Sequence, residues 1–131
     1  MKKDIEIPIA KDVQVAIIRE WNEEFLSKDW NAYIINNRAD QIEMVMVVSK
    51  GFDEERQTTT MRHSMGTILP SDFKKIELLQ EEVLALDNEF FVTFFAEGKL
   101  FEKRFLFQKN TVSEKNLSTI PIIEKDGISA K

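Results

Sequence analysis

Two phenylalanine-rich segments separated by a short turn constrain the fold of this chain most strongly. Residues 90–95 read Phe-Phe-Val-Thr-Phe-Phe, and residues 100–107 read Leu-Phe-Glu-Lys-Arg-Phe-Leu-Phe. So many large apolar side chains cannot all face water, and each segment therefore needs a buried face. Gly98 lies between the two segments and supplies the positive φ that a tight hairpin turn requires. The sequence predicts a closing β-hairpin over residues 89–108.

Length and composition indicate a single domain that can fold alone. The chain has 131 residues, of which 43% are hydrophobic and 31% are charged. A domain of this length buries roughly 65–70% of the surface that its unfolded chain exposes, which is enough for one core. The composition is far from the apolar-poor and highly charged signature of disordered chains.

Charge and cysteine content exclude several classes of function. The net charge is −5, and no run of Lys or Arg is longer than a pair. Binding to nucleic acid needs clustered cations that neutralise phosphates, so we expect no nucleic-acid partner. The chain has no cysteine, which excludes disulfides, thiolate catalysis and cysteine-ligated metal centres.

The start of the chain and its hydropathy bear on location. Lys2 and Lys3 are not followed by an apolar segment of the length that a secretory signal needs. No segment approaches the ~20 consecutive apolar residues of a membrane-spanning helix. We therefore expect a cytoplasmic protein with no membrane partner.

Four segments before residue 66 have the pattern of β-strands. Apolar residues alternate with others over 13–21, and a second strand is expected over 30–35. Residues 42–48 are uniformly apolar and branched, which predicts a central strand followed by a turn at 49–55. Residues 57–65 combine three successive threonines with polar residues on both faces, which is typical of a strand at an exposed sheet edge.

Residues 68–88 fit two patterns. A spacing of three or four residues, which would form one face of a helix, relates Phe73, Ile76, Leu79, Val83 and Leu86. However, Ile76 and Leu78 also alternate with Glu77 after a turn that contains Pro70, as in a strand. We favour a strand over 73–79 followed by one short helical turn at 81–86.

The expected elements together predict an all-β domain. About seven short strands with turns every 8–12 residues are typical of an immunoglobulin-like or fibronectin-like β-sandwich, and a barrel is the second possibility. We expect an N-terminal arm over 1–11, one sandwich domain over 12–110, and a partly disordered C-terminal tail over 111–131. Within the tail, the apolar residues 120–123 are able to dock on the domain.

His63 is the only histidine, so any imidazole-based chemistry depends on it. Its neighbour Ser64 would point to the opposite face of a strand, and the two cannot form a local pair of nucleophile and base. We therefore interpret His63 as a structural or surface residue. A catalytic role would need a carboxylate from elsewhere in the chain, and the sequence does not identify one.

The other residues with chemical potential favour ordinary structural roles. Asp53, Glu54 and Glu55 lack the spaced donors and the glycine of a calcium loop, and the four glycines are too far apart to form a phosphate-binding loop. We expect no metal and no cofactor. Trp21 and Trp30 are candidates for an aromatic platform, but packing is the interpretation that we favour, with Trp30 between the sheets.

Short segments of the chain resemble a known family. They are residues 20–25 (Glu-Trp-Asn-Glu-Glu-Phe), 28–31 (Lys-Asp-Trp-Asn), 61–64 (Met-Arg-His-Ser) and 88–94 (Asn-Glu-Phe-Phe-Val-Thr-Phe). Over about residues 5–126 the chain resembles small uncharacterised proteins from Bacteroidetes, some of which are labelled as phenylalanyl-tRNA synthetase subunits. The resemblance implies no catalytic or binding residue, and residues 61–66 do not match an adenylation motif.

Three functional hypotheses follow from the sequence. The first is a non-enzymatic interaction or accessory domain that binds another protein, or a second copy of itself, through an exposed strand edge. Its candidate contact residues are Thr58, Thr60, Arg62, His63 and Trp21. The second is a small-ligand-binding or saccharide-binding sandwich, which would place an exposed tryptophan beside a concavity. The third is an enzyme that uses His63 with a carboxylate.

Overall fold

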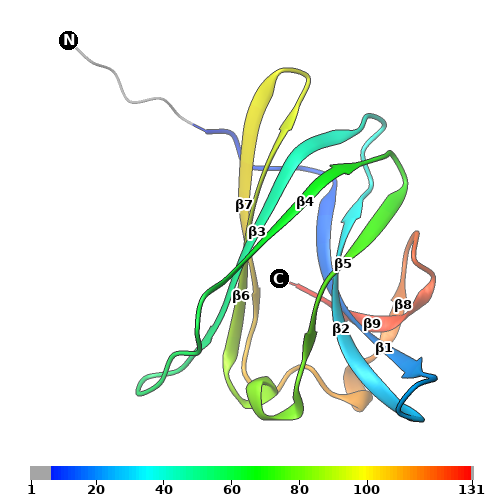
Figure 1. The fold of residues 1–131 in the computed structure, drawn as a ribbon, viewed down its shortest axis with the longest axis vertical. Coiled ribbons are helices and arrows are strands. Elements are labelled where there is room, and N and C mark those ends of the chain that lie inside the picture. Colours follow the sequence, from blue (N-terminus) through cyan, green and yellow to red (C-terminus); the bar gives the residue numbers. More distant parts are fainter. Residues whose placement is uncertain (1–6, 131) are drawn as a thin grey trace.

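The computed structural model describes residues 7–130, which form two antiparallel β-sheets packed face to face (Figure 1). This architecture confirms the predicted all-β sandwich. The strands are β1 (Val13–Asn22), β2 (Ser27–Asn36), β3 (Ile42–Phe52), β4 (Met61–Ile68), β5 (Asp72–Leu79), β6 (Asp87–Ala96), β7 (Lys99–Phe107), β8 (Ser118–Ile120) and β9 (Lys125–Ser129). Two short 3₁₀ helices, η1 (Glu81–Ala85) and η2 (Glu114–Asn116), complete the described elements.

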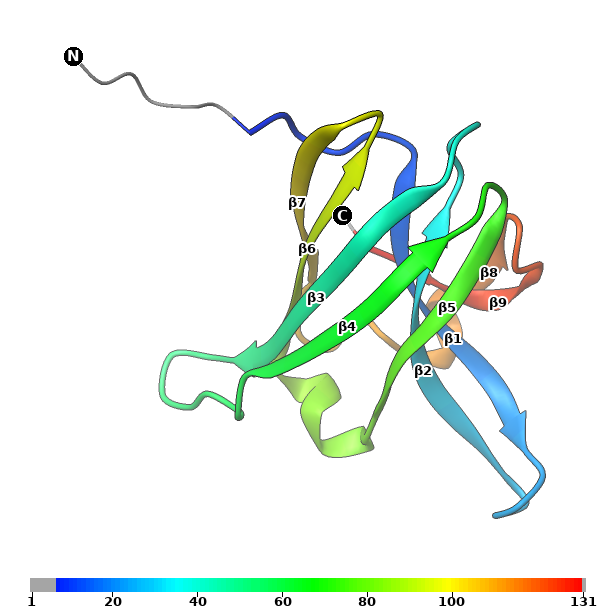
Figure 2. The same ribbon diagram turned by 45° about the horizontal axis from the view of Figure 1, so that its top comes forward.

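Two of the edge strands, β4 and β5, lie next to each other in the chain but in different sheets. One sheet has the order β4-β3-β6-β7 and the other has the order β5-β2-β1-β9-β8. β3 lies inside its sheet, as the uniformly apolar sequence predicted, but it extends to Phe52 instead of ending at residue 48. β4 and β5 are consecutive in the chain and lie at the edges of different sheets, on the same side of the molecule (Figure 2).

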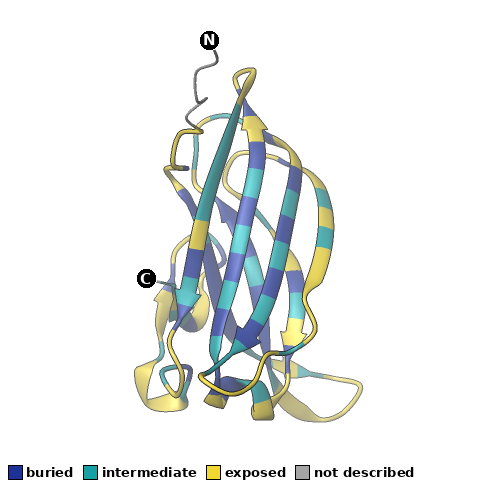
Figure 3. Cartoon of the chain, turned by 90° about the vertical axis from the view of Figure 1, so that its left-hand side faces the viewer, coloured by how far each residue is buried: buried dark blue, intermediate teal, exposed yellow. Residues whose placement is uncertain are grey.

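The β6–β7 hairpin forms as predicted and supplies much of the core. Glu97 and Gly98 have φ values of 53° and 73°, which is the backbone conformation of a two-residue hairpin turn. The pleat directs Phe90 and Phe94 inward, where both are at most 1% exposed. Figure 3 shows this alternation of buried and less buried positions along the strands.

A second apolar cluster lies on the outer face of the five-stranded sheet. It contains Ala16, Ile18, Ile35, Ile120 and Ile123. This cluster explains why β1 is buried on both faces, although its sequence predicted a half-buried strand. Residues 120–123 dock on the domain, as their apolar character allowed.

The predicted boundaries at the two ends of the chain need correction. Residues 111–130 are not a separate tail, because β9 pairs with β1 and adds β8 to the same sheet. Most of the arm predicted over 1–11 lies outside the described residues. Its last part pairs with β7, where Ala10 N donates to the carbonyl oxygen of Glu102 over 2.9 Å and Glu102 N donates to that of Pro8 over 3.2 Å.

The region between residues 57 and 86 agrees only partly with the sequence interpretation. The strand and short helical turn favoured over the alternative helix are present as β5 and η1. The edge strand begins at Met61, so Thr58 and Thr60 precede it. Thr58 instead closes the β3–β4 loop, because Gly51 N donates to Thr58 Oγ1 over 2.8 Å and Thr58 N donates to the Gly51 carbonyl over 2.7 Å.

Candidate functional site

A cavity of about 360 Å³ lies between the sheets on the side where β4 and β5 form their edges. β4 ends and β5 begins at the turn over residues 69–71, and the two strands separate from there toward η1 (Figure 2). Lys74 Nζ donates to the Met65 carbonyl over 2.9 Å near this turn. Within residues 7–130, no backbone hydrogen bond joins β4 to β5. The sandwich therefore remains open along this side.

Three polar side chains from three strands meet at the edge of the cavity. His63 Nε2 on β4 lies 2.7 Å from Glu77 Oε1 on β5. Ser49 on β3 donates its hydroxyl to the same carboxylate oxygen over 2.6 Å. An ionised carboxylate only accepts hydrogen bonds, so Nε2 of His63 carries the hydrogen in this contact. Glu77 thus links the edges of the two sheets.

The local backbone explains how these side chains meet. Side chains alternate along β4, so His63 points inward with Met61, while Arg62 and Ser64 point outward. The pairing of β5 with β2 shifts register between Ala32 and Tyr33, which is a β-bulge. A bulge redirects side chains. Here it allows Ile76 and Leu79 to enter the core while Glu77 reaches across to β4.

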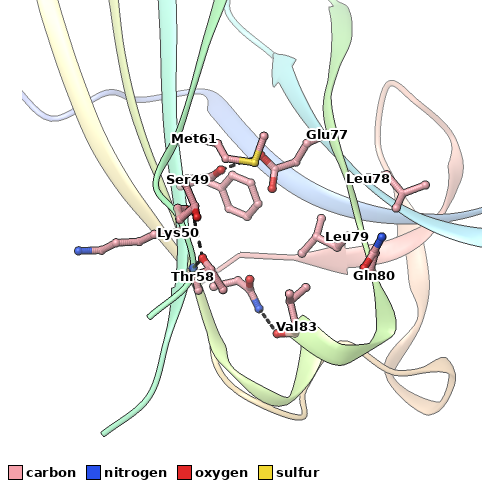
Figure 4. A pocket seen from close by; sticks show the side chains of 13 residues that line it. Ser49, Lys50, Thr58, Met61, Glu77, Leu78, Leu79, Gln80 and Val83 are labelled. Atoms are coloured by element: carbon pink, nitrogen blue, oxygen red, sulfur yellow. Dashed lines mark hydrogen bonds between the residues drawn. The ribbon is translucent and has the colours of Figure 1, made fainter. Parts of the chain in front are cut away.

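The remaining walls of the cavity are mostly apolar. Figure 4 shows Glu77 beside Met61, with Leu79 and Val83 across the opening and Lys50 directed away from it. Lys50 Nζ lies 5.6 Å from the centre of the Phe52 ring. Glu77 is the one carboxylate among the described lining residues. Its Oε2 makes no hydrogen bond to another described residue.

The order of the three groups limits their chemistry. In a Ser-His-Asp triad, the imidazole lies between the hydroxyl and the carboxylate, and it removes the proton of the hydroxyl. Here the carboxylate of Glu77 lies between Ser49 and His63, so the serine donates to the carboxylate and not to the imidazole. The arrangement orients a carboxylate and does not activate a serine.

The structure brings together only some of the residues that the sequence singled out. Thr58 lines the cavity and His63 contacts Glu77, whereas Arg62 and Thr60 are exposed outside it. Trp21 is 51% exposed near the end of the β1–β2 hairpin and does not line this cavity, while Trp30 is 3% exposed in the core, as predicted.

Ser49 and Glu77 were missed by the sequence interpretation. In the sequence, Glu77 lies in a strand pattern between Ile76 and Leu78, and Ser49 falls in the turn predicted over 49–55. Their contact spans 28 residues and joins opposite sheets. No local pattern reports such a contact, although the polar Ser49 that directly follows an apolar strand was a possible signal.

A second polar cluster surrounds Glu20 on the outer face of the five-stranded sheet. Tyr33 Oη and Asn31 Nδ2 donate to Glu20 Oε2 over 2.6 and 2.8 Å, and Lys125 Nζ donates to Oε1 over 2.9 Å. Burial opposes ionisation of Glu20, but the three hydrogen bonds outweigh it and hold the pKa of this carboxyl below its usual value. Burial and the hydrogen bond to Glu20 raise the pKa of the Tyr33 phenol. The cluster fastens β9 to β1 and β2.

The acidic segments show no arrangement suited to a cation. Asp53 accepts hydrogen bonds from the backbone of Glu55 and Arg56 and from the Arg56 guanidinium, which lower the pKa of its carboxyl. Across residues 7–130, no group of three or more His, Asp or Glu side chains is placed to hold a metal ion. None of the helices described over the same range has the length and apolar character needed to cross a membrane.

Comparison with known proteins yields no match to a family model, to a curated protein or to a solved structure. The resemblance to the Bacteroidetes family therefore remains a prediction from the sequence. The opening between β4 and β5 is the feature of the described chain that bears on function.

Proposed function

We propose that this chain is a non-enzymatic interaction domain that binds an extended segment of a partner protein along β4. The observation that carries the proposal is that β4, which borders the cavity lined by Glu77, pairs on one side only among residues 7–130. An added strand would gain main-chain hydrogen bonds from the edge, and a neighbouring pocket would select one of its side chains. Both parts of this recognition mode are present on one side of the molecule.

The edges at β7 and β8 offer less for such binding. β7 is already paired at Glu102 by residues 8–10, and β8 contains only three residues. β4 has eight residues, and its described backbone pairs only with β3. Lys74 occupies one carbonyl of β4, at Met65, and leaves the start of the strand beside the cavity. We therefore place the partner strand along the first half of β4.

The two other functional hypotheses have weaker support. A saccharide platform requires an exposed aromatic ring beside a concavity. Trp21 is exposed away from the cavity, and Trp30 is buried. A serine hydrolase that uses His63 would require a hydroxyl next to the imidazole, and the hydroxyl of Ser49 contacts Glu77 instead.

We also propose a finer fold assignment and a location. The first seven strands support an immunoglobulin-like or fibronectin-like sandwich, because β5-β2-β1 and β4-β3-β6-β7 are joined by connections that repeatedly cross between sheets. β4 pairs with β3, as the additional strand of variable-type domains does. A cytoplasmic location is consistent with the absence of cysteine from the sequence.

The experiment is a selection of binders from a displayed library of random dodecapeptides, followed by amide hydrogen exchange. We expect bound peptides to protect the alternate amides of Met61–Met65 that face away from β3, since these groups gain hydrogen bonds from the added strand. Amides of β7 near Glu102 serve as the internal control, because that edge is already covered.

Two outcomes would overturn the proposal. One is protection at another surface, such as the β1–β2 hairpin, with β4 unchanged. The other is a concentration-dependent dimer in which β4 is protected without any peptide, which would make a second copy of the chain the occupant of this edge.

A further inference from the structure

The cavity beside β4 is lined by one carboxylate, that of Glu77, which contacts His63 at the cavity edge. Glu77 and Lys50 are the charged residues among its described lining, and Lys50 is directed away from the opening (Figure 4). The Glu77 side chain is 18% exposed, so water screens it only in part. A partly buried carboxylate is stabilised by an opposite charge or by hydrogen bonds. Glu77 already accepts hydrogen bonds from Ser49 and His63 at Oε1, and Oε2 is the oxygen that a cation could reach.

Glu77 is held in a fixed orientation for such a partner. Ser49 and His63 both contact Oε1, which leaves Oε2 as the acceptor without a described partner. Ser49 is 3% exposed and has little freedom to move. Because the carboxylate is oriented before binding, a cation that reaches Oε2 would lose less free energy to ordering the site.

The shape and chemistry of the walls fit a long side chain that ends in a charge. Met61, Leu79 and Val83 give the cavity an apolar lining, with Met61 beside the carboxylate and the other two across the opening. Lysine and arginine bury an apolar stem and carry the charge at its tip. A residue in a strand added to β4 that points inward, on the same face as Met61 and His63, would enter this cavity.

We propose that the cavity between β4 and β5 takes one basic side chain, lysine or arginine, of the added strand, with Glu77 Oε2 as its acceptor. This inference rests on the proposed function and specifies the partner. Charge-assisted hydrogen bonds are among the stronger polar contacts in interfaces. The basic residue is therefore the anchor of the bound segment, and the main-chain pairing with β4 sets its direction.

The test uses the same displayed dodecapeptide library and the full chain. We expect the selected peptides to share one enriched position that is lysine or arginine. Replacing that residue by norleucine or citrulline, or replacing Glu77→Gln, should weaken binding by about ten- to a hundredfold in fluorescence anisotropy. Combining the two changes should cause no further loss, because both remove the same contact.

Control variants separate this contact from general charge and from misfolding. Glu77→Gln keeps an oxygen that accepts from Ser49 and His63, so its urea midpoint should stay close to that of the wild type. Glu24→Gln removes an exposed charge from the distant β1–β2 turn and should leave affinity unchanged. If Glu77→Gln unfolds, the norleucine or citrulline peptide on the wild-type chain still decides the question.

The possible failures are distinguishable. Peptides that protect β4 but have no basic consensus, or whose affinity does not depend on Glu77, would overturn the basic anchor and leave the proposed function standing. Failure to select any peptide that protects β4 would overturn both.

Discussion

The two edge strands of the four-stranded sheet, β7 and β4, differ in how far the described chain covers them. At β7, residues 8–10 of the same chain pair with Glu102 and cover part of the edge. At β4, the described chain supplies no further strand, and one lysine side chain contacts a single carbonyl. Unpaired strand edges favour uncontrolled association, and proteins usually cover or disrupt them. An edge that remains open beside a cavity is therefore a candidate for a partner.

The side chains between the two sheets also differ between the β7 side and the β4 side. Behind β7 the walls are largely apolar, with Ala10, Phe105, Phe107 and Val112 all at most 5% exposed, and a smaller cavity of about 250 Å³ lies beside Phe107. Behind β4 the same interlayer space contains Ser49, His63 and Glu77 around a cavity. The covered side contributes stability, and the open side retains groups whose hydrogen-bonding capacity is incomplete.

The largest expected effect is a difference in the free energy of unfolding between substitutions on the two sides. Phe94 is fully buried and its ring stacks on Phe101, whereas Met61 is 49% exposed at the cavity. We expect Phe94→Ala to lower the free energy of unfolding by about 3–5 kcal/mol. Met61→Ala should lower it by less than about 1 kcal/mol, because little buried surface is lost. Urea unfolding measures both, and equal losses would contradict the comparison.

The second prediction concerns the strand that closes the covered side. A Cβ at Gly127 would lie 2.6 Å from the Ile17 carbonyl oxygen, so Gly127→Ala should push β9 away from β1. We expect a loss of about 1–3 kcal/mol, with faster amide exchange throughout β8 and β9.

Gly98→Ala is the matched control for this prediction. Gly98 has a positive φ, but a Cβ there would meet no atom within 4 Å. Its strain should stay local to the β6–β7 turn and leave exchange in β9 unchanged. If Gly127→Ala left β9 as protected as in the wild type, the C-terminal strands would not depend on this close approach.

Much of the fold was readable from the sequence because it depends on local patterns. The Phe-rich hairpin, the central strand β3 and the succession of β5 and η1 all follow from periodicity and turn residues. The role of residues 111–130 was not readable in this way. β9 is five residues long, and it depends on β1, more than 100 positions away, for its pairing.

The candidate site was less predictable than the fold. His63 was singled out because it is the only histidine, and the edge position of its strand was also anticipated. Its carboxylate partner was not, because the contact with Glu77 depends on a bulge in β5 and on the packing of two sheets. The strand predicted over 57–65 begins only at Met61, because threonine favours strands but Thr58 here closes a loop with Gly51.

The third prediction tests the polar contacts on the open side. Ser49→Ala removes the buried hydroxyl that donates to Glu77, and we expect a loss of about 1 kcal/mol in the free energy of unfolding. Ser64→Ala is the matched control, because Ser64 is exposed on the outer face of β4, and its effect should be near zero. A loss of several kcal/mol for Ser49→Ala would mean that the open side is as important for stability as the covered side.

The smallest expected effect concerns Glu20, on the sheet that the C-terminal strands complete. Its pKa is lowered from 4.5 in the folded state, so the folded protein binds fewer protons than the unfolded chain just below that pH. The resulting stability is present above about pH 4.5 and is lost as the pH falls through the folded-state pKa. Burial opposes the hydrogen bonds from Tyr33, Lys125 and Asn31, so the net contribution is small.

Comparing Glu20→Gln with the wild type isolates this contribution from that of other acids. The stability difference between the two proteins should be largest above about pH 4.5 and should shrink as the pH is lowered, because a protonated Glu20 resembles glutamine. Glu24→Gln, at an exposed position of the adjacent turn, should show no such trend. A difference that stays constant or grows toward acid pH would mean that the charge of Glu20 does not help to hold β9 against β1 and β2, and that apolar docking of residues 120–123 alone closes this side.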